Sequence, residues 1–196
     1  KAHIFDYDAE TRIDEIILTG EVEIPKDEFN YFPTPQKVIE RLIELANIEI
    51  GMLLLEPSAG QGAIANACAS AGAVVDCVEL MEANYQKLAL DWRAGEITQG
   101  DFLEQPPIAK YDRVVMNPPF AKQQDIKHVN HAIKFLKPDG LLVAVMSSSV
   151  TFRDNKLTQD FRDLIREHGG DIEALPQASF KQSGTMVNTV IVTIPA

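Results

Sequence analysis

The sequence has few cysteines and no long apolar run, and these absences exclude several classes of protein. Cys68 and Cys77 form no Cys-x-x-Cys pair, so neither a disulfide-stabilised secreted domain nor a zinc site is indicated. The four histidines show no metal-binding or catalytic-triad spacing. The apolar run Gly140–Met146 is far shorter than the about 20 residues that cross a bilayer. No signal segment opens the chain, so we expect a cytoplasmic protein without a membrane span or a bound metal.

Basic residues are also scarce, because 18 Lys and Arg stand against 29 Asp and Glu and give a formal net charge of -11. Non-specific affinity for nucleic acid comes from Lys and Arg, which release counterions from phosphates. The charge therefore argues against a general nucleic-acid coat protein. However, nine acidic residues lie within residues 1–30, and many basic residues lie after residue 120. Two interpretations therefore remain for the basic residues: they form a local basic rim, or they belong to a solvated surface of mixed charge.

The 196 residues suit one compact domain, because roughly 100 to 200 residues usually form a single hydrophobic core. We expect an acidic leader at residues 1–30 and one domain at residues 31–196. The sequence begins at Lys1 and not at Met, so a processed or artificial boundary is expected there.

Strand-like and helix-like segments alternate along the domain. Helices are expected from near Pro35 and at residues 61–71, 83–93, 124–136 and 157–168, and strands at residues 52–55, 73–78, 113–116 and 141–146. Two further strands, at residues 172–175 and 187–194, are joined only by a loop. A further short segment precedes Gly100. Together these segments predict an α/β, Rossmann-like, doubly wound sheet of seven mostly parallel strands with an antiparallel C-terminal hairpin.

A glycine-bearing turn, Glu-Pro-Ser-Ala-Gly-Gln-Gly at residues 56–62, follows the first expected strand. Gly60 and Gly62 permit positive φ and a close approach of the backbone to a ligand. The spacing Gly60-x-Gly62-x-x-Ala65 also fits the dinucleotide fingerprint, although turn geometry alone explains two glycines. Glu79 ends the second strand about 20 residues later, where an acid can bind ribose hydroxyls.

The tetrapeptide Asn117-Pro118-Pro119-Phe120 directly follows the strand at residues 113–116. Its two prolines stiffen the loop, remove two N–H donors and keep Asn117 out of the α region. The side-chain carbonyl of Asn117 and the backbone carbonyl of Pro118 are then suited to accept the two hydrogens of an exocyclic amine. Phe120 is suited to stack on a base, although a turn with Phe120 in the core is the alternative.

These motifs, followed in order, resemble those of the class I S-adenosylmethionine-dependent amino-methyltransferases, particularly the DNA adenine-N6 enzymes of restriction-modification systems. The resemblance covers almost the whole chain from Phe32 onward. It implies that S-adenosylmethionine is the cofactor and that the glycine turn lies against its methionine part. It also implies that Glu79 binds the ribose of the cofactor. Asp101 would then accept a hydrogen bond from the amino group of the cofactor's adenine, and the backbone N–H of Phe102 would contact the adenine ring of the cofactor.

The resemblance implies further site residues at both ends of the domain. An upstream motif that closes over the methionine end is matched at residues 32–35. Phe180 matches an aromatic residue that packs against a flipped-out base, with a core or rim position as the alternative. A helix cap is the alternative for Asp101, and a core position is the alternative for Phe102. The expected cofactor-binding residues are Phe32, Thr34, Pro35, Glu56, Pro57, Ser58, Gly60, Gly62, Glu79, Asp101, Phe102 and Asn117, and the expected catalytic residues are Asn117, Pro118, Pro119, Phe120 and Phe180.

The implied function is methylation of the N6 amino group of adenine in DNA. Many enzymes with this motif order carry a recognition domain after the last catalytic strands, whereas this sequence stops at Ala196. A fragment, a recognition subunit or second copy of the chain, or a substrate that needs little sequence reading would each explain the stop. The alternatives for function are an RNA base methyltransferase, a protein glutamine-N5 methyltransferase, a non-catalytic cofactor-binding subunit and an NAD-dependent oxidoreductase.

Overall fold

A computed structural model of the chain describes residues 33–92, 94–177, 179–181 and 187–196. The chain divides into two units, residues 1–30 and 31–196, and every described residue belongs to the second unit. Across these ranges, no helix combines the length and the apolarity that a membrane span requires.

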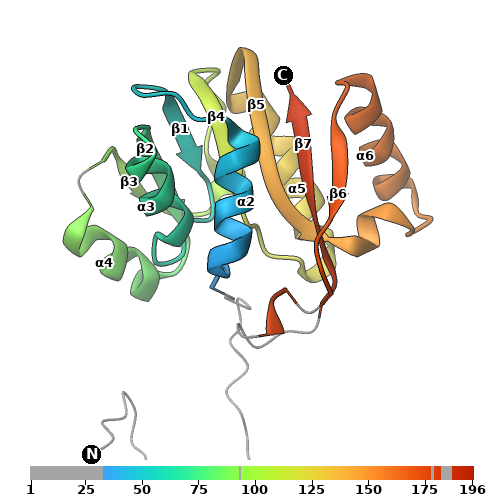
Figure 1. Ribbon diagram of the computed structural model, residues 1–196, viewed down its shortest axis with the longest axis horizontal. Coiled ribbons are helices and arrows are strands. Elements are labelled where there is room, and N and C mark those ends of the chain that lie inside the picture. The colour runs from blue at the N-terminus through green and yellow to red at the C-terminus, as the bar shows by residue number, and fades with distance from the viewer. Residues whose placement is uncertain (1–32, 93, 178, 182–186) are drawn as a thin grey trace, which may run out of the picture. The chain divides into compact units, whose positions relative to one another are not determined.

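Seven strands form one sheet in the order β3-β2-β1-β4-β5-β7-β6 (Figure 1). The first five strands pair in parallel, whereas β7 runs antiparallel to both β5 and β6. This is the α/β, mostly parallel sheet with an antiparallel C-terminal hairpin that the alternating pattern predicts. The strands are β1 (Leu53–Glu56), β2 (Val74–Glu79), β3 (Ile97–Gln99), β4 (Tyr111–Met116), β5 (Leu136–Ser147), β6 (Asp171–Ala174) and β7 (Thr189–Pro195).

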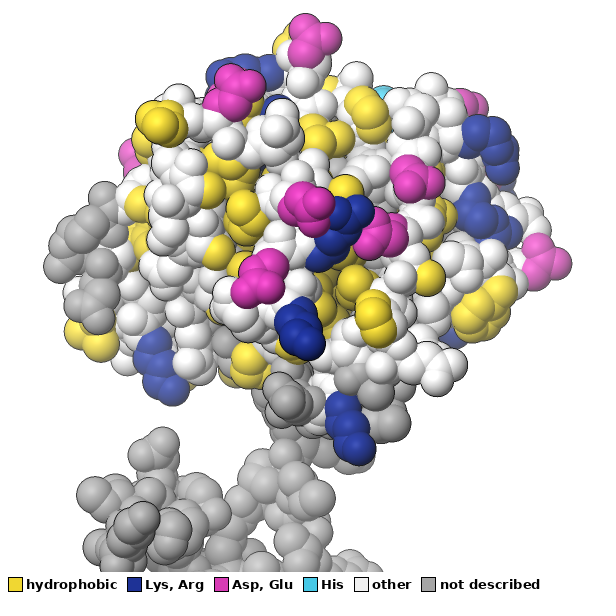
Figure 2. Space-filling view, in the orientation of Figure 1, with side chains coloured by type: hydrophobic (Ala, Val, Ile, Leu, Met, Phe, Trp, Pro, Cys, Tyr) yellow, Lys and Arg dark blue, Asp and Glu magenta, His cyan; other side chains and the backbone are white. Residues whose placement is uncertain are grey.

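Helices cover both faces of the sheet. Figure 1 shows α2 and α3 in front of the strands and α5 behind them. Figure 2 shows basic and acidic side chains interspersed over the face that carries α2. The α-helices are α2 (Gln36–Ala46), α3 (Ala63–Ser70), α4 (Glu82–Asp91), α5 (Gln124–Ala132) and α6 (Lys156–Glu167), and the 3-10 turns are η1 (Phe102–Glu104), η2 (Ala121–Gln123), η3 (Ile133–Phe135) and η4 (Ser148–Thr151).

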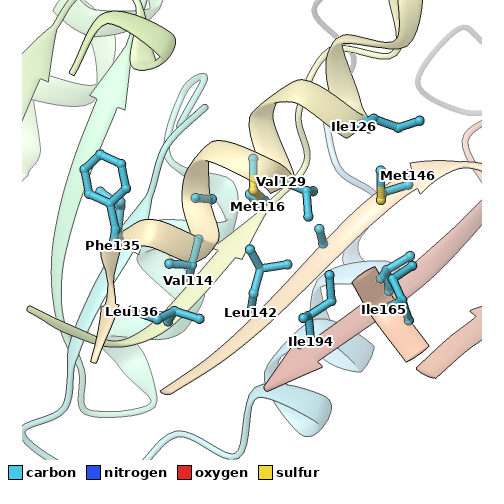
Figure 3. Packing of buried hydrophobic residues seen from close by; sticks show 14 of the residues in the cluster. Val114, Met116, Ile126, Val129, Phe135, Leu136, Leu142, Met146, Ile165 and Ile194 are labelled. Atoms are coloured by element: carbon cyan, nitrogen blue, oxygen red, sulfur yellow. The ribbon is translucent and has the colours of Figure 1, made fainter. Parts of the chain in front are cut away.

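The hydrophobic core consists of two clusters, one on each face of the sheet. Figure 3 shows the first cluster, in which α5 and α6 pack on β4, β5 and β7. The second cluster contains the apolar faces of α2 and α3. Leu142 and Ala144 belong to the first cluster and Val143 and Val145 to the second, and all four are fully buried. This burial on both faces explains why β5 is a continuous apolar run.

Most predicted boundaries lie within about two residues of those observed, and two elements differ by more. The helix expected at residues 124–136 ends at Ala132 and continues as η3. The strand expected from Leu141 begins earlier, at Leu136, because Leu136 pairs with Tyr111 across a register irregularity before regular pairing resumes at Leu141. Local hydrophobicity does not reveal such pairing with a distant strand.

Candidate active site

The strand order changes direction between β1 and β4, because β2 and β3 extend to one side and β5 to the other. Doubly wound sheets bind ligands at such a switch point, beyond the carboxyl ends of their strands. Ser58 follows β1, Asp101 follows β3 and Asn117 follows β4. The three motifs predicted from the sequence therefore meet at the edge where the β1 arrow ends in Figure 1.

The glycine turn and Glu79 are joined by hydrogen bonds. Gly60 and Gly62 have φ values of 55° and 84°, in the left-handed region that favours glycine. The Gly60 N–H donates to Oε2 of Glu79 at 2.6 Å, and the Met81 N–H donates to Oε1 at 2.7 Å. Each carboxylate oxygen keeps a further lone pair, so Glu79 has the acceptors that ribose hydroxyls require.

The side chains of Asp101 and Phe102 stabilise the fold, whereas Oδ2 of Asp101 and the backbone N–H of Phe102 are available to a ligand. Oδ1 of Asp101 accepts the Leu103 N–H at 2.8 Å and so caps η1. The Phe102 ring is buried and packs on the rings of His131 and Phe135, with centroids 4.9 and 5.2 Å apart. Within the described ranges, neither Oδ2 of Asp101 nor the Phe102 N–H makes a hydrogen bond. These groups are the acceptor and the donor that the edge of an adenine ring would need.

Glu56 faces the N-terminus of α3. Its side chain is buried and accepts the Ala65 N–H in the first turn of this helix, while Oε2 has no hydrogen-bond partner among the described residues. Burial raises the pKa of Glu56, and the nearby charge of Glu79 raises it further. A contact between Glu56 and the cofactor stays a prediction. Pro57 beside it is buried, and Ser58 is half-buried.

Asn117 is oriented by a residue far away in the sequence. Its Nδ2 donates to Oγ1 of Thr34 at 3.0 Å, across 83 positions of the chain. Oδ1 of Asn117 is buried and has no hydrogen-bond partner among the described residues. A buried acceptor without a donor costs about 1 to 3 kcal/mol, so a donor from a ligand would stabilise this site. The Asn117–Thr34 hydrogen bond thus connects the upstream motif to the tetrapeptide at residues 117–120.

Aromatic and proline residues surround Asn117. Pro118 is buried, and Pro119 and Phe120 are half-buried. Phe120 packs against the core cluster that also contains Phe180. Phe180 is 1% exposed, so it occupies the core position that was its alternative, and its contact with a base stays a prediction.

Pro35 and Phe32 are the remaining residues of the predicted site. Pro35 precedes α2 in an extended conformation, and its carbonyl accepts the N–H groups of Val38 and Ile39 at 2.9 and 3.0 Å. This start of the helix holds the neighbouring Thr34. Phe32 lies outside the described residues, so its role stays a prediction.

His128 and Asp125 of α5 are site neighbours to which sequence reasoning assigned no role. Nδ1 of His128 lies 3.4 Å from Oγ of Ser58. Burial lowers the pKa of His128 to about 4, although the charge of Asp101 opposes this. The buried Asp125 accepts the N–H of Ser147 at 3.1 Å and so ties α5 to the end of β5. Both residues lie on the buried face of α5. Two polar residues on an otherwise apolar helix face are the sequence feature that could have identified them as neighbours of the site.

This sheet, with its polar groups gathered at the switch point, is the architecture of the Rossmann-like methyltransferases. The chain belongs to the methyltransferase small domain family, whose sequence profile matches residues 48–168. S-adenosylmethionine is its cofactor. The glycine turn, the spare lone pairs of Glu79 and the unbonded groups of Asp101 and Phe102 fit this cofactor.

Solved structures with this fold include nucleic-acid methyltransferases at low identity. A modification subunit assigned to a type I restriction enzyme from Vibrio vulnificus YJ016 is 15% identical, with a TM-score of 0.71 over 94% of this chain and 48% of that chain. A protein assigned as an RNA methyltransferase from Pyrococcus horikoshii is 20% identical, with a TM-score of 0.64 over 88% and 90%. An RNA methyltransferase from Salinibacter ruber in complex with S-adenosyl-L-homocysteine is 16% identical, with a TM-score of 0.56 over 83% and 92%.

The present chain therefore spans about half the length of the modification subunit. No curated protein sequence matches it.

Proposed function

We propose that this domain transfers the methyl group of S-adenosylmethionine to the exocyclic N6 amino group of adenine in DNA. The observation that carries the proposal is the side chain of Asn117. Thr34 binds its amide nitrogen, and the carbonyl oxygen is left as a buried acceptor without a donor. An amine hydrogen of a nucleobase is a donor that fits this acceptor.

The proposed mechanism uses acceptors and not a strong base. The lone pair of an aromatic amine is delocalised into the ring, so the amine is a poor nucleophile. Oδ1 of Asn117 and the Pro118 carbonyl each accept one amine hydrogen, which favours a tetrahedral nitrogen with its lone pair directed at the methyl group. When bound, S-adenosylmethionine would supply the methyl group on a sulfonium sulfur that takes the electrons of the C–S bond as the N–C bond forms, and the methylated nitrogen would release one proton to solvent. Phe120 stacks on the ring and keeps the amine in this position.

DNA is supported by the motif order and by the likeness to a restriction-enzyme modification subunit. On this proposal, a recognition subunit or a second copy of the chain supplies sequence recognition. RNA base methylation is the second candidate, because the chain covers 90% and 92% of two proteins assigned as RNA methyltransferases.

The test is transfer of labelled methyl groups to an adenine-containing oligonucleotide. Asn117→Ala is expected to lower the rate by about 100- to 1000-fold, as the loss of one preorganised hydrogen-bonding group does in other enzymes. Thr34→Val is expected to lower kcat by about 10-fold, because the Asn117 amide loses the bond that orients it. Thr34→Ser keeps the hydroxyl and serves as the matched control. Unchanged transfer by the Asn117 variant, or label only in guanine or protein, would contradict the proposal.

A further inference from the structure

We infer that two loops beside Asn117 form a surface that holds a nucleic-acid strand next to the target base. This strand-contact surface consists of Lys122, Phe152 and Arg153. In it, Phe152 stacks on a neighbouring base, and Lys122 and Arg153 bind phosphates. The inference rests on the proposed function and assigns residues that the methyl-transfer step does not use.

The first loop has an unusual backbone directly after the catalytic tetrapeptide. Lys122 and Gln123 have φ values of 53° and 59°, so two successive residues other than glycine adopt the left-handed conformation. Side chains with a Cβ rarely adopt this conformation, and such strain persists only where the surroundings hold it. Strained backbone is frequent at ligand-binding sites. The strain in this loop is therefore explained if the loop holds the Lys122 side chain towards a ligand.

A clamp of side-chain hydrogen bonds holds this loop to the second one. Nε2 of Gln123 donates to Oγ1 of Thr158 at 2.8 Å, and Oε1 accepts from Nδ2 of Asn155 at 2.9 Å. Oδ1 of Asn155 in turn accepts the Thr158 N–H at 2.9 Å and caps α6. Both ends of the Gln123 amide are therefore used, and the loops after β4 and β5 are joined.

The second loop presents a large apolar side chain to solvent. Phe152 is 71% exposed, although it lies only three residues before the clamp residue Asn155. The loop starts at the end of β5, which is the neighbour of β4 in the sheet, so it lies beside the strand that carries Asn117. The Arg153 carbonyl accepts a guanidinium N–H of Arg162 at 3.0 Å, which fixes the backbone next to Phe152. An exposed aromatic ring on a braced loop has a π-face on which a base can stack.

The charges of the two loops suit a phosphate backbone. Lys122 is exposed and forms no ion pair with any residue in the described part of the chain. Arg153 is exposed and lies near Asp125, where burial raises the pKa of the carboxyl group and the charge of Arg153 opposes this rise. In a chain with a net charge of -11, local cations of this kind are where phosphates can bind. The combination of an aromatic ring and cations is typical of surfaces that bind single strands or splayed bases.

The test compares each variant with a matched control at the opposite edge of the sheet. Phe152→Ala is paired with Ile50→Ala, because Ile50 is 92% exposed in the turn before β1. Lys122→Ala is paired with Lys134→Ala, which removes the same charge just before the amino end of β5. The full chain is titrated with a fluorescent adenine-containing oligonucleotide at several salt concentrations, and KM and kcat for methyl transfer are measured in parallel.

Phe152→Ala is expected to raise the Kd and KM for the oligonucleotide by about 10-fold, and Phe152→Trp to restore both, while kcat at saturation stays within about 2-fold. Lys122→Ala is expected to reduce the slope of log K against log salt by about 1. If both variants behave like their controls while the wild type methylates the oligonucleotide, this inference is wrong and the proposed function stands. If the wild-type chain neither binds nor methylates DNA or RNA, both fail.

Discussion

At the residue scale, the site depends on polar groups that the fold buries while leaving part of their hydrogen-bonding capacity unused. Oδ1 of Asn117 is buried and has no donor among the described residues. Glu79 accepts the Gly60 N–H of the glycine turn on Oε2 and the Met81 N–H on Oε1, so each oxygen has used one lone pair. Binding of cofactor and substrate is favourable at such groups because it satisfies acceptors that folding has already removed from bulk water.

His128 provides a prediction about pH. Burial lowers its pKa to about 4, below the ordinary value of 6.5, so the folded protein disfavours the protonated ring. Its contribution to stability is therefore complete above pH 6.5 and is lost as the pH falls towards 4. We expect the wild type to lose about 3 kcal/mol more unfolding free energy than His128→Asn between pH 7 and pH 4. Urea denaturation at the two pH values measures this, and parallel losses in the two proteins would rule it out.

Single residues could be predicted from sequence where their role is encoded by their immediate neighbours. The rigidity of the loop at Asn117 follows from the two prolines beside it, and the conformation of Gly60 follows from its turn. The bond between Asn117 and Thr34 could not be predicted, because it depends on where α2 begins relative to the end of β4. The burial of Phe180 likewise depends on packing between distant segments.

At the element scale, the central strands and the mostly parallel sheet with its antiparallel C-terminal hairpin followed from composition and alternation. The run Leu142–Met146 is apolar at every position because both faces of β5 are covered. The short strand β3 and the 3-10 turns were harder to predict, since they span only three or four residues, too few for a hydrophobic period, and some depend on local capping, such as that by Asp101. Likewise, the clamp of Gln123, Asn155 and Thr158 joins two elements by polar contacts that have no sequence period.

The turn between β1 and α3 provides a prediction at this scale. A Cβ at Gly62 would lie 2.5 Å from Cδ1 of the buried Leu88, and Gly62 also has a φ of 84°. Gly169 has a φ of 68° and nothing within 4 Å of a Cβ, so Gly169→Ala measures backbone strain alone. We expect Gly169→Ala to cost about 1 kcal/mol and Gly62→Ala about 1 to 3 kcal/mol more.

Denaturant unfolding of the two variants checks this, together with calorimetry of S-adenosylhomocysteine binding. Binding should weaken only in Gly62→Ala, because only that glycine lies in the glycine turn that we propose contacts the cofactor. Equal destabilisation of the two variants with equal binding would show that the close packing of this turn is unimportant.

At the scale of the whole molecule, the described unit is a catalytic scaffold whose polar groups gather at one edge of the sheet. Its surface carries mixed charges, as Figure 2 shows for the face over α2, so attraction of nucleic acid depends on local cations and not on the net charge. The proposed methyl-transfer site and the proposed strand-contact surface both lie on loops that follow the neighbouring strands β4 and β5. Their arrangement predicts that the amine is selected by Asn117 and that the strand is held by residues outside the catalytic tetrapeptide.

Mass spectrometry identifies the methylated nucleoside directly in DNA and RNA that were incubated with the protein and S-adenosylmethionine. We expect N6-methylated deoxyadenosine in the DNA sample and none after incubation with Asn117→Ala. Methylation confined to RNA would replace the DNA substrate with the second candidate. Methylation of guanine alone, or N6-methylated deoxyadenosine formed equally by Asn117→Ala, would contradict the role of Asn117 as the acceptor of an adenine amine.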